Sequence, residues 1–295
     1  MNDRPDDPWA PRWRGQPGRL EVTYATFTDR TSGTGLWLHH EMVSPSAGGA
    51  SHTTAWAAVF PTRTAPSWQR VEEIAIGPDG SAGEAGHISW DLTWDAFAQH
   101  TLFTFPRWAW DRELLPAAQC VPAPHLDVTG RVSWDGGSLD AVDAVGGVAR
   151  IFGHGNAKRW GWIHADLGGG DVMELVTAVS LRPGLNKLPP VTHVRFRLGG
   201  RDWPGLAGPS FGLTTRLGIE SWSVKGRIGR AKLSVQVTQP ADRCVAIDYH
   251  DPDGATATCH NTERADIEIR LVGGPTGDRT WRLDGTGHSE VGTRP

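Results

Sequence analysis

The sequence predicts an all-β protein made of antiparallel barrels or sandwiches. Apolar side chains occupy every second position from Ile88 to Trp94, with polar residues between them, as in a strand with one buried and one solvated face. The 37 glycines and 21 prolines in 295 residues supply many turns. No long amphipathic helix is found that could connect parallel strands, so only a few short helices are expected. The same alternation recurs at residues 232–237, 266–271 and 280–283.

Two β units are expected after a short leader. Residues 1–18 are charged and proline-rich, so we expect this leader to be poorly ordered or loosely docked. The stretch Arg182–Pro190 interrupts all pattern and is the best candidate for a linker. Twelve of the 15 tryptophans lie at or before Trp162. We therefore predict a larger first domain over residues 19–182 and a smaller second domain over residues 183–295.

The composition argues against several classes of function. A net charge of −4 gives no general attraction to nucleic acid or to an anionic membrane. No stretch approaches the roughly 18 apolar residues of a spanning helix, and residues 1–16 lack the apolar core of a secretory signal. We expect a cytoplasmic protein, a monomer or homodimer, that binds no nucleic acid and does not insert stably into membranes.

Cysteine and histidine patterns do not predict a metal site. The three cysteines lack zinc spacing, and no histidine pair has a zinc-protease pattern. Cys244 and Cys259 flank a predicted hairpin, where they could lie near each other or be small core residues. No nucleophile elbow, phosphate-binding loop or dinucleotide-binding pattern is present. We therefore expect neither a metal nor another cofactor.

The segment 152–167 is richest in chemical groups. Read as a strand, it places Trp160, Trp162, His164 and Asp166 on one face. Two indoles beside an imidazole could form the wall of an apolar pocket with one proton-carrying group. The alternative is a tryptophan-rich core with a hydrogen-bonded histidine. His154 lies between two glycines, as an exposed functional group or as a turn residue.

A second concentration of such residues lies in the segment 35–42. Trp37, His39 and Glu41 would project to one side of a strand. A carboxylate beside an imidazole can fix its tautomer and raise its basicity. The later run from His52 to Phe60 adds Trp56 to a further polar and aromatic face.

These segments together resemble a known family. The element Arg-Trp-x-Trp-Ile-His at 159–164, followed by a glycine turn and Met173-Glu174-Leu175, is similar to the junction segment of the AttH-like and carotenoid 1,2-hydratase proteins. Tocopherol cyclases and lipocalin-like Diels–Alderases share that architecture. The segment 35–41 resembles the early tryptophan-containing strand of the family. The stretches 114–116, 121–124 and 128–132 resemble its mid-domain region.

The resemblance implies two lipocalin-like antiparallel β-barrels with a hydrophobic pocket in or between them. It also implies an enzyme that hydrates or cyclises isoprenoids or polyketides without a redox cofactor. The family commonly has an acidic element before the Trp-x-Trp strand, whereas residues 154–158 here contain no carboxylate. Either His154 has taken over the role of that acid, or the protein binds its ligand without catalysis.

Our leading hypothesis is a cyclase, hydratase or isomerase for a lipophilic small molecule. Its expected catalytic residues are His154, His164, Glu41 and Asp166. Its expected substrate-binding residues are Trp37, His39, Trp56, Asn156, Trp160 and Trp162. The first alternative is a carrier of a hydrophobic molecule, and the second is a structural protein whose tryptophans simply fill the core.

Overall fold

The computed structural model describes residues 7–113 and 115–295. The first six residues of the predicted leader and Leu114 of the mid-domain motif lie outside the described residues. Within the described ranges, the helices are α1 (Arg107–Asp111) and the 3₁₀ turns η1 (Leu185–Lys187) and η2 (Ala241–Arg243). The prediction of an all-β fold with few short helices is confirmed.

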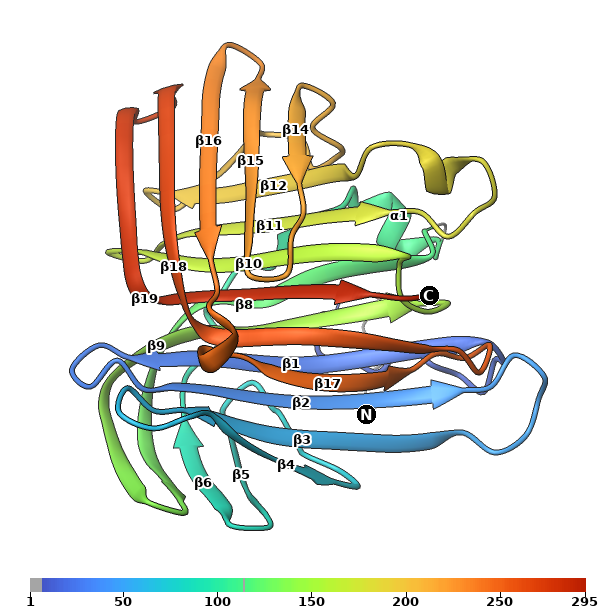
Figure 1. Cartoon of the computed structure of the whole chain (residues 1–295), viewed down its shortest axis with the longest axis vertical. Helices are drawn as coiled ribbons and strands as arrows, with labels where there is room; N and C mark the ends of the chain where they lie inside the picture. Colours follow the sequence, from blue (N-terminus) through green and yellow to red (C-terminus); the bar gives the residue numbers. More distant parts are fainter. Residues whose placement is uncertain (1–6, 114) are drawn as a thin grey trace.

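The first half of the chain forms one nine-stranded antiparallel sheet (Figure 1). Its order is β4-β3-β2-β1-β9-β8-β6-β5, and β7 pairs with β8. The strands are β1 (Arg19–Asp29), β2 (Gly35–Ser44), β3 (His52–Phe60), β4 (Ser67–Val71), β5 (Gly80–Ala85), β6 (Ile88–Thr93), β7 (Leu102–Phe103), β8 (Ala117–Trp134) and β9 (Gly137–Gly153). Burial alternates strictly along β6, as the sequence pattern predicts.

The second half forms a ten-stranded antiparallel sheet in the order β13-β12-β11-β10-β19-β18-β16-β15-β14, and β17 pairs with β18. The strands are β10 (Arg159–Gly168), β11 (Asp171–Val179), β12 (Val191–Leu198), β13 (Arg201–Trp203), β14 (Leu213–Arg216), β15 (Ser221–Ile228), β16 (Ala231–Thr238), β17 (Val245–His250), β18 (Thr256–Gly274) and β19 (Gly277–Thr293).

The two sheets repeat one topology. In each, the first strand pairs with both the second and the last strand, namely β1 with β2 and β9, and β10 with β11 and β19. The change of sheet falls between Gly153 and Arg159, whereas the sequence places the domain boundary at 182/183. The stretch Arg182–Pro190 joins β11 to β12 inside the second sheet. The two sheets span stretches of the chain that are equal in length.

The longest strands bend, and this curls each sheet. Pairing between β8 and β9 shifts register at three places, and so does pairing between β18 and β19. Such bulges bend a strand and increase its local twist, so the two ends of one long strand run in different directions. Figure 1 shows β18 and β19 running upright at the upper left and then turning across the molecule.

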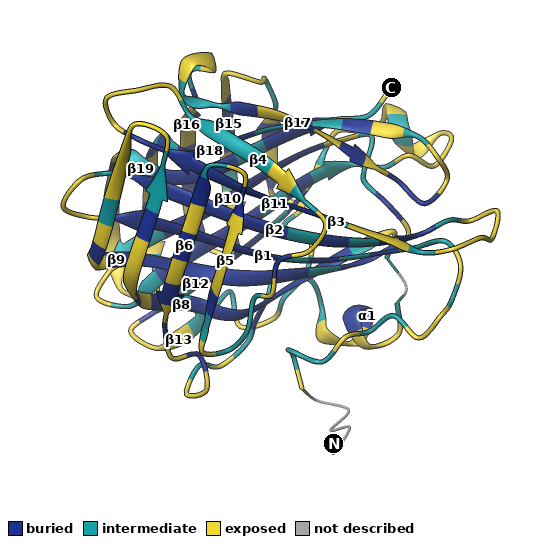
Figure 2. Ribbon diagram, turned by 90° about the horizontal axis from the view of Figure 1, so that it is seen from below, coloured by how far each residue is buried: buried dark blue, intermediate teal, exposed yellow. Residues whose placement is uncertain are grey.

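Three main apolar clusters hold the fold together. One lies within each sheet, and the third joins the two sheets. The third cluster is rich in large rings, among them Trp37, Trp56, Trp160, Trp162 and Tyr249. Figure 2 shows the dark blue, buried stretches of the strands concentrated in the middle of the molecule.

The described part of the leader packs on the first sheet. Arg150 donates hydrogen bonds to the carbonyl oxygens of Pro8 and Ala10, at 2.6 and 2.8 Å. It also forms an ion pair with Glu21, whose carboxylate accepts the backbone N–H of Trp13 at 2.9 Å. Residues 7–18 are therefore held by specific hydrogen bonds.

Candidate functional site

An apolar cavity of about 350 Å³ lies between the two sheets. Its volume falls at the lower end of the range for small-molecule sites. The first sheet contributes Leu20, Val22, Tyr24, His39, Glu41, Ala117, Ala118, Gln119 and Ile151. The second sheet contributes Trp160, Trp162, Val176, Ala178, Val191, His193, Tyr249 and Glu290. The loops contribute Phe105, Leu115, Pro116, Gly155, Asn156, Ala157, Ser180 and Leu181.

Aromatic rings form much of the cavity wall. Trp160 and Trp162 alternate along β10 and face the cavity together, with Gly161 turned to the opposite side. The chain has two tyrosines, and both line this cavity. Tyr24 meets Trp162 edge-on, with ring centroids 5.3 Å apart. A ligand here would therefore contact the faces and edges of several rings.

His39 and Glu41 form the polar part of the wall on β2. Their positions two residues apart place both side chains on one face of the strand. The Nε2 of His39 lies 3.5 Å from Oε2 of Glu41, and both side chains are buried. Among the described residues, neither ring nitrogen of His39 and neither carboxylate oxygen of Glu41 has a hydrogen-bond partner.

Burial shifts the titration of both groups toward their neutral forms. Removal from water raises the pKa of Glu41 from 4.5 to about 7, although Arg70 and nearby histidines favour its charged form. Burial lowers the pKa of His39 well below its ordinary value. Near neutral pH the pair therefore consists of a neutral imidazole beside a carboxyl group that can gain or lose a proton.

Trp37 and Trp56, expected to bind substrate, lie behind His39. The Trp56 indole stacks on the His39 imidazole at 3.9 Å between ring centroids, and Trp37 meets it edge-on at 5.4 Å. Both indoles are completely buried, and neither lines the cavity. They fix the orientation of the His39 ring without exposing their own surface.

A second carboxyl group faces the cavity from the other sheet. Glu290 accepts a hydrogen bond from the Trp160 indole and another from the Tyr249 hydroxyl at 3.4 Å. Burial raises the pKa of Glu290, and the hydrogen bonds partly oppose that rise. The cavity thus has one carboxyl group on each sheet, with different numbers of hydrogen-bond donors.

His164 belongs to a separate buried cluster. Its Nδ1 lies 2.6 Å from Oε1 of Glu174, whose other oxygen accepts the Trp162 indole N–H at 3.1 Å. The His164 ring stacks on His288 at 5.3 Å, and His288 contacts Glu263 at 3.4 Å. None of these histidines or glutamates lines the cavity, so Trp162 separates this cluster from the ligand space.

The other expected catalytic residues point elsewhere. His154 is exposed, with Nδ1 3.0 Å from a guanidinium nitrogen of Arg19. Asp166 lies 2.8 Å from Nδ1 of His125 and pairs with Arg30. Of the expected residues, the cavity thus brings together His39, Glu41, Asn156, Trp160 and Trp162.

A carboxylate does reach the segment that has none of its own. Asp251, from the turn between β17 and β18, accepts the backbone N–H and the side-chain amide of Asn156 at 2.8 and 3.0 Å. Asp251 also pairs with Arg294 at 2.8 Å. These contacts fix the loop 154–158 at the end of the cavity, where Asn156 contributes to the wall.

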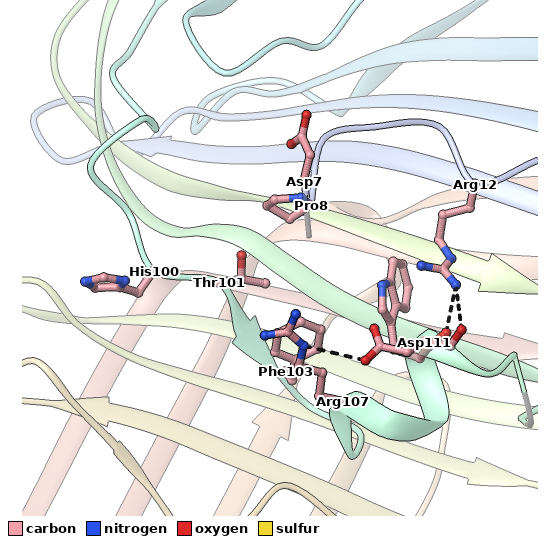
Figure 3. A pocket seen from close by; sticks show the side chains of 9 residues that line it. Asp7, Pro8, Arg12, His100, Thr101, Phe103, Arg107 and Asp111 are labelled. Carbon is pink, nitrogen blue, oxygen red and sulfur yellow. Dashed lines mark hydrogen bonds and ion pairs between the residues drawn. The ribbon is translucent and has the colours of Figure 1, made fainter. Parts of the chain in front are cut away.

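A second pocket of about 260 Å³ lies between the leader and α1 (Figure 3). Arg12 donates to the carbonyl oxygens of Trp110 and Asp111 at 2.9 and 3.4 Å, and Arg107 pairs with Asp111 at 3.6 Å. The guanidinium groups in this pocket therefore already interact with oxygen atoms of the protein. The aromatic cavity, with its unmatched polar atoms, is the stronger candidate for a functional site.

Sequence reasoning missed Tyr24, Tyr249, Glu290, Gln119 and His193 as cavity residues. The rarity of tyrosine was an available signal, since both tyrosines line the cavity. Glu290 carried no such signal, because nothing local indicates that β19 pairs with β10. The three cysteines are free thiols. In the described ranges no cluster of at least three metal-ligating side chains occurs, and no helix is long and apolar enough to span a membrane.

Comparison with known proteins gives consistent matches. The tocopherol cyclase-like family model matches residues 85–293. Uncharacterized proteins from two strains of Mycobacterium tuberculosis are each 47% identical over 301 residues, covering 96% of this chain and 89% of theirs. Among solved structures, CghA has a TM-score of 0.62 at 14% identity, covering 99% of this chain and 95% of its own.

Two further structures share the fold. A putative AttH from Nitrosomonas europaea has a TM-score of 0.58 at 13% identity, covering 96% of this chain and 98% of its own. Kievitone hydratase from Nectria haematococca has a TM-score of 0.54 at 12% identity, covering 92% of this chain and 88% of its own. These similarities confirm the lipocalin-like double-barrel architecture that the sequence resemblance implies.

Proposed function

The chain belongs to the tocopherol cyclase-like family, and from this premise we propose a cofactor-independent enzyme that cyclises, hydrates or isomerises a lipophilic small molecule. Family membership supports a cyclase or hydratase kind of function. The proposed substrate class is an unsaturated isoprenoid or polyketide, and the proposed site is the cavity between the two sheets. In this proposal, Glu41 and His39 carry out the proton transfer, and His154, which is exposed, does not.

One observation carries the proposal: the Glu41 carboxyl group is buried in the wall of an apolar aromatic cavity, and this burial raises its pKa to about 7. A general acid works best when its pKa lies near the working pH. Neither oxygen of Glu41 has a hydrogen-bond partner within the described part of the chain, so its proton is available to a bound ligand. Buried groups with shifted pKa values in a pocket are typical of active sites.

The proposed reaction begins with proton transfer from Glu41 to a carbon–carbon double bond. The π electron pair forms the new C–H bond, leaving a carbocation on the neighbouring carbon. The faces of Trp160 and Trp162 can stabilise that cation by about 2 kcal/mol each when water is excluded. A substrate hydroxyl then closes a ring, or water adds, and the oxygen loses its proton to the Glu41 carboxylate. The acid is thereby regenerated without any other reactant.

His39 is proposed to orient the acid. Burial lowers the pKa of His39, so a neutral ring lies 3.5 Å from the Glu41 carboxyl group and adds no charge beside it. Trp56 stacks on this ring and holds its plane. In reactions that end in a new alkene, the Glu290 carboxylate on the opposite sheet is proposed to remove the proton from carbon. Proton exchange with water then returns Glu290 to the carboxylate and Glu41 to the acid.

The test is turnover of a panel of unsaturated isoprenoids and polyketides in D₂O. Proton delivery by the enzyme puts one deuterium on carbon per product molecule. We expect Glu41→Gln to lower turnover by about 10²–10⁴-fold. His154→Ala, which alters an exposed imidazole outside the cavity, should stay within a few-fold of wild type. Equal turnover by Glu41→Gln and wild type would contradict the assignment.

The second candidate function is a carrier for a hydrophobic molecule. The predominantly apolar and aromatic lining supports it, because such a wall binds ligand without needing a titratable group. A carrier would bind members of the same panel, change its tryptophan fluorescence, and release them chemically unaltered. A cavity of about 350 Å³ disfavours the reading in which the tryptophans only fill the core.

A further inference from the structure

The mouth of the cavity is bordered by a segment with exposed apolar side chains. Leu181 and Val191 line the cavity and are 37% and 42% exposed. Leu185 and Leu188 lie between them in sequence and are 47% and 55% exposed. In Figure 1 the yellow segment carrying η1 projects from the right-hand side of the molecule. Grouped exposed apolar side chains mark interaction sites more often than scattered ones do.

The same segment is basic, although the chain as a whole is negative. Arg182 and Lys187 are exposed among the leucines, and no aspartate or glutamate occurs between Glu174 and Asp202. The net charge of −4 argues against a general attraction to anionic surfaces. The distribution of charge, however, leaves this edge of the second sheet with a local excess of cations.

An aromatic group lies next to the end of this segment. Phe105 and Leu115 line the cavity, and the Phe105 ring lies 4.2 Å from the ring of His193, two residues after Val191. Between them in sequence, on α1, Trp108 is 57% exposed. Tryptophan is enriched where proteins meet the headgroup region of a bilayer.

We propose that the segment 181–191 docks on the surface of an anionic lipid bilayer, so that the cavity opens onto the membrane. The leucines enter the boundary between headgroups and acyl chains, while Arg182 and Lys187 contact lipid phosphates. Association is peripheral and reversible, since two basic residues and a few leucines are a small anchor. A lipophilic substrate would then enter the cavity without crossing water. This last consequence rests on the proposed function.

The experiment is sedimentation of the full chain with phosphatidylcholine vesicles, with and without about 30 mol % phosphatidylglycerol. We expect binding to the anionic vesicles that weakens with salt. Leu185→Asp combined with Leu188→Asp should lower the affinity at least tenfold. Arg182→Gln combined with Lys187→Gln should remove the preference for phosphatidylglycerol. Thermal unfolding of each variant checks that the fold is retained.

The matched control is Val142→Asp. Val142 is 78% exposed and lies toward the hairpin end of β9, away from Gly153 at the cavity end. This variant should bind vesicles like wild type. Absence of binding, equal binding to both lipid compositions, or unchanged binding by both double variants would overturn the proposal. Because vesicle binding needs no turnover, its outcome is separate from that of the Glu41→Gln test.

Discussion

Two clusters of buried titratable side chains lie between the sheets, and they are built differently. In the cluster behind Trp162, both oxygens of Glu174 are engaged, and Thr26 and Thr28 lie 2.8 Å from the two nitrogens of His288. In the cluster at the cavity, the ring nitrogens of His39 and the carboxylate oxygens of Glu41 have no hydrogen-bond partner among the described residues. In the first cluster, His164 Nε2 and Glu263 Oε1 have no partner among the described residues. The cost of burying polar groups is therefore offset at Glu174 and His288 and remains at His39 and Glu41.

The difference separates a structural role from a chemical one. Satisfied polar groups cross-link the two sheets, because Thr26 and Thr28 belong to β1 and His288 belongs to β19. Unsatisfied groups at a cavity keep their hydrogen-bonding capacity for a ligand, and functional sites are where proteins retain such local instability. The contrast leads to measurable differences between the two clusters.

The largest expected difference is in stability. Glu174→Ala leaves the Trp162 indole N–H and Nδ1 of His164 without their partner and opens a small void, so we expect a loss of about 3–5 kcal/mol. Glu41→Gln breaks no hydrogen bond among the described residues and should cost less than about 1 kcal/mol at pH 5. Urea denaturation gives both values. Equal losses in the two variants would remove the distinction between the clusters.

The second difference is in pH dependence. The pKa of Glu41 rises from 4.5 to about 7 on folding, so its contribution to stability is complete below pH 4.5 and lost as pH rises through 7. A shift of this size corresponds to about 3 kcal/mol. Glu41→Gln lacks this loss. Its stability relative to wild type should therefore rise by about 3 kcal/mol between pH 4.5 and pH 9, in paired denaturation curves. A constant difference would show that Glu41 is not perturbed.

The smallest expected effect concerns the position of Trp160. A Cβ atom at Gly292 would overlap the Trp160 ring, so Gly292→Ala must displace the indole and weaken its bond to Glu290. We expect about tenfold weaker binding of an apolar ligand, roughly 1.4 kcal/mol, by calorimetric titration. Gly205→Ala is the control, because a Cβ there meets no atom within 4 Å. Unchanged affinity in Gly292→Ala would show that Trp160 does not shape the site.

Local patterns predicted much of the fold. Alternation at 88–94 corresponds to β6 with alternating burial, and the spacing of Trp160 and Trp162 places both at the cavity. The predicted domain boundary at 182/183 was based on the proline-rich stretch. In the structure, the chain passes from the first sheet to the second before β10 begins. Pairing of β10 with β19 joins the first and last strands of the second sheet, and no local signal carries it.

The same limit applies to the candidate site. His39 and Glu41 share a strand face, so their proximity follows from spacing. The partners of His164 and the approach of Glu290 depend on how the two sheets meet, which sequence spacing does not encode. His154 was attractive by its place near the missing family acid, yet its side chain points to solvent and Arg19.

The most direct test of the account is titration of the Glu41 carboxyl group. Carbon-13 NMR of protein labelled at glutamate side chains, with Glu41→Gln to assign the signal, follows its ionisation. We predict a midpoint near pH 7, because burial against the cavity disfavours the charged form. A midpoint near the ordinary value of 4.5 would contradict the claim that Glu41 is the acid of this cavity.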